Sequence, residues 1–140
     1  MGLHPTKLTQ IPWDKKPFAL IADPKAGENH LWAPHVILHD GLYYMFYCGG
    51  NLTDNTKYRI NLATSTQLEG WTRHPNNPMV VDGYGARDPF VLAMPDGWAM
   101  YYEATSEPEG GNFIVACRKS KDLIHWGERQ GDCANLGKLL

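Results

Sequence analysis

The chain has 140 residues, of which 43% are apolar and 20% charged, a composition typical of one globular domain and not of a disordered segment. Its formal net charge is −2, and its 13 Lys and Arg are scattered, which excludes the basic surface that binds nucleic acid. No apolar run approaches the roughly 20 residues that cross a bilayer, and the first ten residues lack the apolar stretch of a signal peptide. We therefore expect a soluble chain that, as it stands, is cytoplasmic and has neither nucleic-acid nor membrane partners.

Residues 1–27 have the pattern of the tail of an upstream unit followed by a linker. The stretch LTQIPW, which ends at Trp13, reads as the end of that unit. PFALIADP then reads as the connection into the next unit, because its prolines interrupt regular structure.

Residues 28–75 predict one unit of four short antiparallel strands. HVILH is an extended run, DG at 40 and 41 forms a tight hairpin turn, and LYYMFYC supplies an aromatic-rich strand. YRINLATS alternates polar and apolar residues, and GWTRH closes the unit. Because no segment keeps the 3.6-residue apolar period of a helix, the sequence predicts an all-β fold.

Residues 76–130 repeat this unit, ahead of a tail at 131–140. WAPHVILHDGLYYMFY, from Trp32, and RDPFVLAMPDGWAMYY, from Arg87, share a proline in third place, a valine two places on, an Asp-Gly turn and an aromatic strand. STQLEGW and SKDLIHW share the pattern S-x-x-L-x-x-W. One and the same spacing, which we call the repeat offset, separates the members of three matched pairs: Pro34 and Pro89, Ser65 and Ser120, Trp71 and Trp126.

The two turns predict one difference between the units. HDG at 39–41 corresponds to MPDG at 94–97, which we interpret as a one-residue insertion in the second hairpin. Four-stranded units that repeat at about 40 to 55 residues are typical of β-propeller blades. The sequence thus predicts about two and a half blades, with a β-meander or open sandwich as the alternative.

The stretch GARDPFVL places two opposite charges directly before an apolar strand. Pro89 favours an extended conformation for Asp88, which would hold the carboxylate in one direction at the start of the strand. A positioned functional carboxylate fits this pattern. So does a structural turn, in which Asp88 caps backbone N–H groups and Arg87 pairs with it.

Three stretches together resemble the five-bladed propeller glycoside hydrolases of families 43 and 32, the group of arabinanases, arabinofuranosidases, xylosidases and β-fructosidases. They are HLWAPHVILHDGLYYMFYCGG, GARDPFVLAMPDGWAMYYEA and SKDLIHWGE, and the resemblance covers residues 28–130 as blades two and three. It implies that the first strand of each blade delivers one residue into a central pocket. It also implies that three carboxylates from successive blades carry out the hydrolysis, with Asp88 as the middle one, which orients substrate and tunes the acid.

We expect three further residues to bind substrate, Arg87 of the motif itself and Trp32 and His35 of the first unit. Arg87 would keep Asp88 ionised and bind sugar hydroxyls. Trp32, at the position equivalent to Arg87, would be a stacking platform for a sugar ring, or else a core residue. His35 would donate a hydrogen bond to substrate, or else be a capped structural histidine. Trp71 and Trp126 are expected to pack.

The chain departs from the family pattern at the other two carboxylates. The base is expected well upstream of Trp32, and Asp23, in the linker, is an unsuitable candidate. The acidic glutamate is expected after residue 130. Glu103 reads as a rim residue at the far end of its strand, and Glu107 and Glu109 as solvated loop residues.

These patterns predict a glycoside hydrolase-like protein acting on arabinofuranosides, xylosides or fructosides, truncated so that it lacks the base and the acid. The alternative is a non-catalytic carbohydrate-binding half-propeller that closes as a homodimer, because open blades expose apolar faces and unpaired strand edges. Hydrolysis of this kind needs no cofactor. Three cysteines without a C-x-x-C pair predict neither a disulfide framework nor a metal site, only buried thiols: Cys48, Cys117 and Cys133.

Overall fold

The computed structural model describes residues 16–51, 54–83 and 85–130, and almost all of its regular structure is β. One short 3-10 helix, η1 (Pro24–Ala26), precedes the first strand, and the side chain of Asp23 caps it. Asp23 is therefore a capping residue within the linker. The predicted tails around Trp13 and at 131–140, with Cys133, lie outside the described residues.

The first sheet has four antiparallel strands in the order β1-β2-β3-β4. They are β1 (His30–His39), β2 (Leu42–Asn51), β3 (Asp54–Ser65) and β4 (Thr72–Arg73). Asp40 and Gly41 both have positive φ, 49° and 77°, as the two central residues of a type I′ hairpin turn require. The predicted Asp-Gly hairpin is confirmed.

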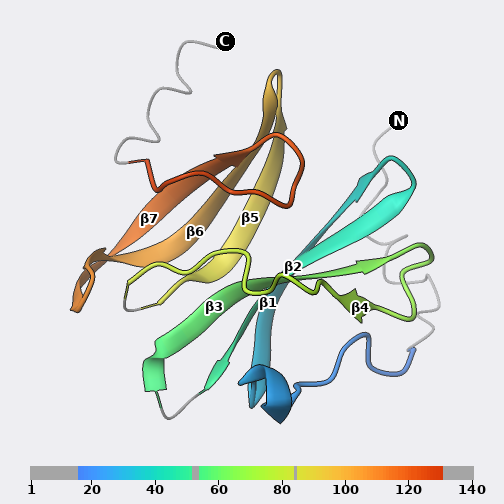
Figure 1. Cartoon of the computed structure of the whole chain (residues 1–140), viewed down its shortest axis with the longest axis horizontal. Helices are drawn as coiled ribbons and strands as arrows, with labels where there is room; N and C mark the ends of the chain where they lie inside the picture. Colours follow the sequence, from blue (N-terminus) through green and yellow to red (C-terminus); the bar gives the residue numbers. More distant parts are fainter. Residues whose placement is uncertain (1–15, 52–53, 84, 131–140) are drawn as a thin grey trace, which may run out of the picture.

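The second sheet contains β5 (Arg87–Met94), β6 (Gly97–Glu107) and β7 (Gly110–Ser120), also antiparallel. Residues 126–130 take the place of its fourth strand, because Gly127 N donates to Lys119 O at 2.9 Å and Gln130 N donates to Cys117 O at 2.9 Å. The all-β prediction is confirmed, and Figure 1 shows the two sheets side by side with β5 next to the first.

Strand register repeats between the two sheets at the repeat offset. His39 pairs with Leu42 across the first hairpin, and Met94 pairs with Gly97 across the second, so the two loops are equal in length. The predicted one-residue insertion is therefore wrong. Pro95 occupies the first loop position and cannot adopt positive φ, so the Asp-Gly pair falls one place later and Gly97, at φ 140°, opens β6.

The S-x-x-L-x-x-W pattern builds the turn after the third strand of each unit. Leu68 and Leu123 both lie in the left-handed region, at φ 62° and 68°. In the second unit the Ser120 hydroxyl accepts a hydrogen bond from Leu123 N at 2.9 Å. Trp71 packs against the cluster that contains Met45 and Tyr47, and Trp126 against the main core, so the expected packing roles of both tryptophans are confirmed.

The main core lies between the two sheets. It joins Phe46, Ile60 and Leu62 of the first to Val91 and Met100 of the second. The segment that leads into β5 runs along β3, where Met79 N donates to Ile60 O at 2.8 Å and Ala86 N donates to Tyr58 O at 3.2 Å. This pairing sets where β5 begins.

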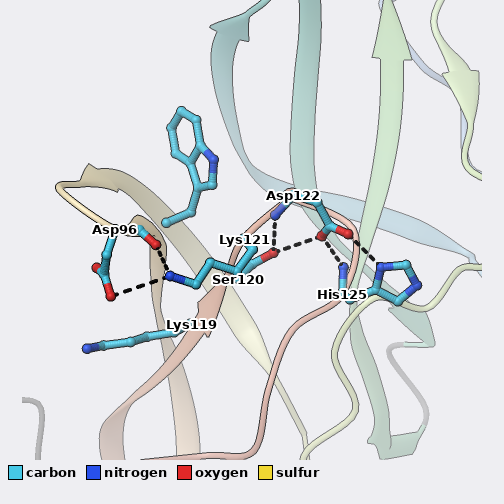
Figure 2. Close-up of a pocket in the computed structure, with 7 residues that line it drawn as sticks. Asp96, Lys119, Ser120, Lys121, Asp122 and His125 are labelled. Carbon is cyan, nitrogen blue, oxygen red and sulfur yellow. Dashed lines mark hydrogen bonds and ion pairs between the residues drawn. The ribbon is translucent and has the colours of Figure 1, made fainter.

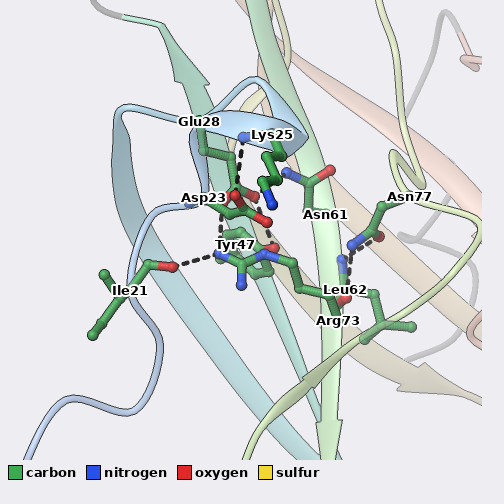
Figure 3. A network of polar contacts seen from close by, with 9 residues as sticks. All are labelled: Ile21, Asp23, Lys25, Glu28, Tyr47, Asn61, Leu62, Arg73 and Asn77. Atoms are coloured by element: carbon green, nitrogen blue, oxygen red, sulfur yellow. Dashed lines mark hydrogen bonds and ion pairs between the residues drawn. The ribbon is translucent and has the colours of Figure 1, made fainter.

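Each unit also contains a carboxylate, buried in the first and partly buried in the second, that ties its entry segment to its later strands. In the first, Glu28 accepts hydrogen bonds from the hydroxyl of Tyr47 at 3.0 Å, the amide of Asn61 at 3.2 Å and the guanidinium of Arg73 at 2.6 Å (Figure 3). Burial, and then the negative charge of Glu28, raises the pKa of Tyr47.

Asp82 plays the same part in the second unit. It accepts hydrogen bonds from the hydroxyl of Tyr102 at 2.5 Å and the guanidinium of Arg129 at 3.3 Å. Tyr102 is the equivalent of Tyr47 at the repeat offset, and burial raises its pKa in the same way. Each unit therefore has a carboxylate bonded to a tyrosine and an arginine, but only the tyrosine occupies a matched position of the repeat.

Candidate active site

The Arg-Asp-Pro motif forms a β-bulge at the start of β5. The register of β5 against β6 shifts between Arg87 and Phe90, and Asp88 within the bulge has a φ of 54°. The prediction that Asp88 is extended is wrong. A bulge inserts an extra residue into one strand, and here that constraint overrides the usual effect of Pro89 on the residue before it.

The first sheet contains the same bulge without a charged residue. The register of β1 against β2 shifts between Trp32 and His35, and Ala33, the equivalent of Asp88, has a φ of 46°. Because alanine adopts this conformation at the equivalent position, the bulge does not require a carboxylate. The interpretation of Asp88 as a turn-capping residue is thereby weakened.

Asp88 is exposed at the surface of the sheet. Within the part of the chain that the structure describes, no hydrogen bond or ion pair engages its carboxylate. Its charge is felt by the buried thiol of Cys48 on the neighbouring strand β2. Asp88 is therefore available to accept hydrogen bonds from a ligand.

Arg87 does not pair with Asp88, contrary to the prediction from sequence. Its guanidinium forms an ion pair with Glu103, its partner across the β5–β6 register. Two aromatic rings flank it, with the Arg87 Cζ atom 5.3 Å from the ring centre of Tyr58 and 5.2 Å from that of Phe113. The guanidinium is thus held by one carboxylate and two rings.

Trp32 contacts Tyr58, one of the two rings beside the Arg87 guanidinium. The rings of Trp32 and Tyr58 are stacked, with centroids 5.8 Å apart and planes 20° from parallel. Trp32 is partly exposed, whereas Tyr58 is buried. Trp32, Tyr58, Arg87 and Phe113 therefore form a continuous row, in which the cation lies between the rings of Tyr58 and Phe113.

His35 lies between the first strands of the two sheets. Its Nε2–H donates to the carbonyl of Val91 at 3.0 Å, and its ring centre is 4.8 Å from that of Phe90. These contacts give His35 a structural role that joins β1 to β5. A contact with substrate stays a prediction.

Three residues of this group were missed or misplaced from sequence: Tyr58, Glu103 and Phe113. Glu103 is not remote from the motif, because antiparallel pairing brings the end of β6 beside the start of β5. Counting back from a tight hairpin loop would have located it. Tyr58 and Phe113 are separated by the repeat offset, and that repeated aromatic was the available signal.

Cys48 is the equivalent of Glu103 at the repeat offset, so the two units differ chemically at three matched positions. The first unit has Trp32, Ala33 and Cys48, and the second has Arg, Asp and Glu in their places. Burial, with the negative charge of Asp88 second, raises the pKa of the Cys48 thiol to about 12. At these three matched positions, charge is therefore specific to the second unit.

Two hollows of the surface lie at opposite ends of β5 and differ in size. One of about 40 Å³ lies between Tyr58, Arg87, Glu103 and Phe113, which is room for a water molecule or one hydroxyl group. A larger one of about 280 Å³ lies beside the β5–β6 hairpin, at the opposite end of β5 (Figure 2).

Two pairs of charged side chains in the larger hollow already bind each other. Lys121 pairs with Asp96, and Nδ1 of His125 lies 2.7 Å from an Asp122 carboxylate oxygen. The hydrogen bond from His125 holds the pKa of Asp122 well below its usual range. This hollow is separate from the Arg-Asp-Pro motif, and we assign the candidate site to the motif.

The described residues contain no group of three or more His, Cys, Asp or Glu side chains placed to hold a metal ion. None of their helices is long and apolar enough to span a membrane.

Known proteins support the architecture. The family model described as the glycosyl hydrolases family 32 N-terminal domain matches residues 6–137. A Bombyx mori GH32 β-fructofuranosidase superposes with a TM-score of 0.62 at 22% identity, covering 81% of this chain and 26% of that one. A thermostable family-43 glycoside hydrolase superposes with a TM-score of 0.56 at 23% identity, covering 73% of this chain and 38% of the other. These likenesses support a partial propeller over the meander or sandwich.

Curated relatives are similar in sequence over shorter stretches. The "Probable arabinan endo-1,5-alpha-L-arabinosidase C" of Aspergillus clavatus is 33% identical over 98 residues, which is 59% of this chain and 30% of the relative. The "Arabinan endo-1,5-alpha-L-arabinosidase A" of Aspergillus niger is 35% identical over 71 residues, or 47% and 22%. The chain therefore spans less than a third of the length of these relatives. Since the family model covers nearly all of it, the chain belongs to the family of glycosyl hydrolases family 32 N-terminal domains.

Proposed function

We propose that this chain takes part in the hydrolysis of glycosidic bonds of the arabinofuranoside, xyloside or fructoside class and contributes Asp88 as a carboxylate of the pocket. One observation carries the proposal. Two bulges share a backbone conformation, with φ of 46° at Ala33 and 54° at Asp88, yet only the second carries charged side chains. The bulge therefore does not require the charges of Arg87 and Asp88, and we assign these charges to substrate binding.

The geometry suits Asp88 to orienting substrate. Glycoside hydrolysis uses two carboxyl groups, an acid and a base or nucleophile, on opposite sides of the scissile bond. A third carboxylate near them accepts hydrogen bonds from sugar hydroxyls and raises the pKa of the acid by like-charge repulsion. The exposed carboxylate of Asp88, held at a fixed point on a strand, fits this third role.

Glu103 does not fit the role of the acid. Its carboxylate is engaged by the guanidinium of Arg87, whereas a general acid must present its proton to the leaving oxygen. We assign Glu103 to holding Arg87 in place. The described residues then supply one of the three carboxylates, and the acid and base are contributed from other parts of the protein.

Arg87 serves as a rigid donor to sugar hydroxyls. Its guanidinium has five N–H donors, and the ion pair with Glu103 uses only part of them. The rings of Tyr58 and Phe113 on either side restrict its orientation. Trp32 extends the same row with a partly exposed indole ring, on which we expect a sugar ring to stack.

Asp88→Asn tests the proposal, because it removes the charge and keeps the shape. We expect hydrolysis, or saccharide binding where the chain alone does not turn over, to fall by about 10²- to 10³-fold, measured on arabinan oligosaccharides, xylosides and fructosides. Asp40→Asn is the matched control, since Asp40 is also an exposed aspartate at positive φ, in the first hairpin. An unchanged activity and affinity in Asp88→Asn, or equal losses in both variants, would overturn the assignment.

A further inference from the structure

His30 lies beside Trp32 and Tyr58, the two rings that the first unit contributes to the row around Arg87. The His30 ring centre is 4.3 Å from that of Trp32 and 5.3 Å from that of Tyr58, and the centres of those two rings are 5.8 Å apart. All three separations are within the range of favourable aromatic contacts. Each ring therefore contacts the other two, and a displaced Trp32 indole would lose contacts with both neighbours.

These three rings lie where the first unit meets the second. His30 and Trp32 are two places apart on β1, so their side chains project from the same face of the first sheet. Tyr58, on β3, is buried, accepts a backbone hydrogen bond from Ala86 N at 3.2 Å and lies against the guanidinium of Arg87. The elements that hold the three rings therefore belong to both units.

A chain of side-chain hydrogen bonds fixes the orientation of the His30 ring. The amide nitrogen of Asn29 donates to the amide oxygen of Asn51 at 2.9 Å, and the amide oxygen of Asn29 accepts from Nδ1–H of His30 at 2.8 Å. With its proton on Nδ1, the ring is neutral and Nε2 is its acceptor nitrogen. His30 is therefore held at one ring nitrogen by its neighbour in the chain.

The other ring nitrogen favours the neutral form. Nε2 of His30 is buried and has no hydrogen-bond partner among the residues that the structure describes. A proton on Nε2 would be a buried donor without an acceptor. Burial lowers the pKa of His30 from its ordinary value of 6.5, against the opposing effect of the Glu28 charge. His30 therefore acts at neutral pH as an uncharged ring that packs against Trp32 and Tyr58.

The second unit holds its matched side chain in a different way. Gly85 is the equivalent of His30 at the repeat offset and has no side chain to offer. Arg87, the equivalent of Trp32, is held by the carboxylate of Glu103 instead. The first unit has a thiol at the position of that carboxylate, and an indole forms no ion pair. Ring contacts from His30 therefore take the place of the ion pair.

We propose that His30 is a positioning residue of the saccharide site, which holds the indole of Trp32 in the orientation that receives a sugar ring. The role of Trp32 as a sugar platform rests on the proposed function, whereas the contact between the two side chains does not. An indole that is fixed before binding loses less conformational entropy when a sugar stacks on it. Removal of the His30 ring should therefore weaken saccharide binding through Trp32.

Fluorine NMR of the full chain labelled with fluorotryptophan tests the positioning without a ligand. Trp32→Phe identifies the Trp32 resonance among those of the five tryptophans. We expect His30→Ala to shift and broaden this resonance, and His30→Phe, which keeps a ring, to restore it. His39→Ala is the matched control and should leave the resonance in place, because His39 lies at the other end of β1 and contacts Trp98, with ring centres 5.0 Å apart. An unchanged Trp32 resonance in His30→Ala, or equal changes at all tryptophans, would overturn the inference.

Titration with arabinan oligosaccharides tests whether His30 acts through Trp32. We expect His30→Ala to lower the affinity by about tenfold in the wild-type chain. It should have no further effect in a chain that carries Trp32→Ala, because the platform is then already lost. Equal losses of affinity in both backgrounds would contradict the inference.

The same titrations separate this inference from the proposed function. If Asp88→Asn weakens binding and His30→Ala does not, the inference fails and the proposed function stands. If neither variant changes the affinity although His30→Ala moves the Trp32 resonance, the proposed function fails and the positioning of Trp32 by His30 stands.

Discussion

The guanidinium of Arg87 is the most constrained charged group near the candidate site. Glu103 binds it from the neighbouring strand, and two aromatic rings lie against it at about equal distances, 5.3 and 5.2 Å. A lysine could not reproduce this arrangement, because an ammonium group is a point charge without a planar face to place between rings. The position of Arg87, and not only its charge, is therefore part of the site.

Glu103→Gln should weaken saccharide binding without unfolding the protein. Loss of the carboxylate charge removes the ion pair that orients Arg87, and we expect affinity to fall by roughly tenfold, the equivalent of about 1.4 kcal/mol. Isothermal titration with arabinan oligosaccharides measures the change. Glu107→Gln, at the exposed end of the same strand, is the control and should bind like the wild type. Equal binding by Glu103→Gln and the wild type would show that Glu103 does not position Arg87.

For single residues, the sequence allowed us to locate the Arg-Asp-Pro motif but not to predict the contacts of its side chains. Arg87 and Asp88 were found because a short charged motif stood at a repeated position before a strand. Their conformations were not, because the preference that Pro89 imposes is local, whereas the bulge arises from pairing with β6. Glu103 was misplaced for the same reason, since a cross-strand contact depends on register.

The two bulges are the elements that aim the first strands of both units. Each places a non-glycine residue at positive φ, Ala33 at 46° and Asp88 at 54°, which costs on the order of 1 kcal/mol. Pairing on both sides of the bulge offsets this cost. The bulge should therefore tolerate small or polar residues and reject β-branched ones.

Ala33→Val should destabilise the protein by about 1–2 kcal/mol, even though valine is the better strand former, because a β-branched side chain is strained at positive φ. Ala93→Val is the matched control. Ala93 is also an exposed alanine on a first strand, but it has no positive φ, so its replacement should be neutral or slightly stabilising. Urea unfolding measures both. Equal losses of unfolding free energy in the two variants would contradict this explanation, because they would show that the positive φ at position 33 is not the cause.

Strands and hairpins were well predicted from sequence because periodicity and turn chemistry are local signals. The predicted insertion failed on a point of detail. Matching Asp-Gly with Asp-Gly was reasonable, but the loop is defined by which residues pair, and Pro95 excludes the positive φ that Asp40 adopts at the equivalent place. The two loops have the same length, but the Asp-Gly pair lies one place later in the second loop, and this shift resembled an insertion in the sequence.

The whole molecule should lose stability at high pH. The pKa of the Cys48 thiol is raised to about 12, and the pKa values of Tyr47 and Tyr102 are also raised, each chiefly by burial. A raised folded-state pKa contributes stability that is fully present below the unfolded-state value and is lost as pH rises toward the folded-state value. For Cys48 that interval runs from the ordinary value of 9.0 to about 12.

We therefore expect the free energy of unfolding to fall as pH rises from about 9 toward 12, measured by urea unfolding at several pH values. Cys48→Ala should reduce this slope, because the thiol no longer ionises in the unfolded chain, whatever the variant costs at neutral pH. A slope that is identical in Cys48→Ala and the wild type would contradict the assigned role of the thiol.

At the largest scale, repetition was the most informative feature of the sequence. Three pairs of matched positions predicted that the chain consists of repeated units, and the register of the two sheets agrees with the repeat offset from the first strand to the third. The polar groups around Glu28 and Asp82 were not predicted. These carboxylates differ in type, and the repeat offset from Glu28 leads to Gly83, one place beyond Asp82. Buried polar clusters are recognisable only once the chain has brought their members together.

The constant register of the two hairpins has a consequence for how such a chain can lengthen. Any stretch that runs from one position to its equivalent contains one complete set of strands, one bulge and one entry segment. Duplicating that stretch of coding sequence would add a unit whose pairings, turns and inner core repeat those already present, whatever point within the unit the duplication starts from. New chemistry could then be introduced by changing a few side chains beside the bulge, which is how the Trp, Ala and Cys of the first unit differ from the Arg, Asp and Glu of the second.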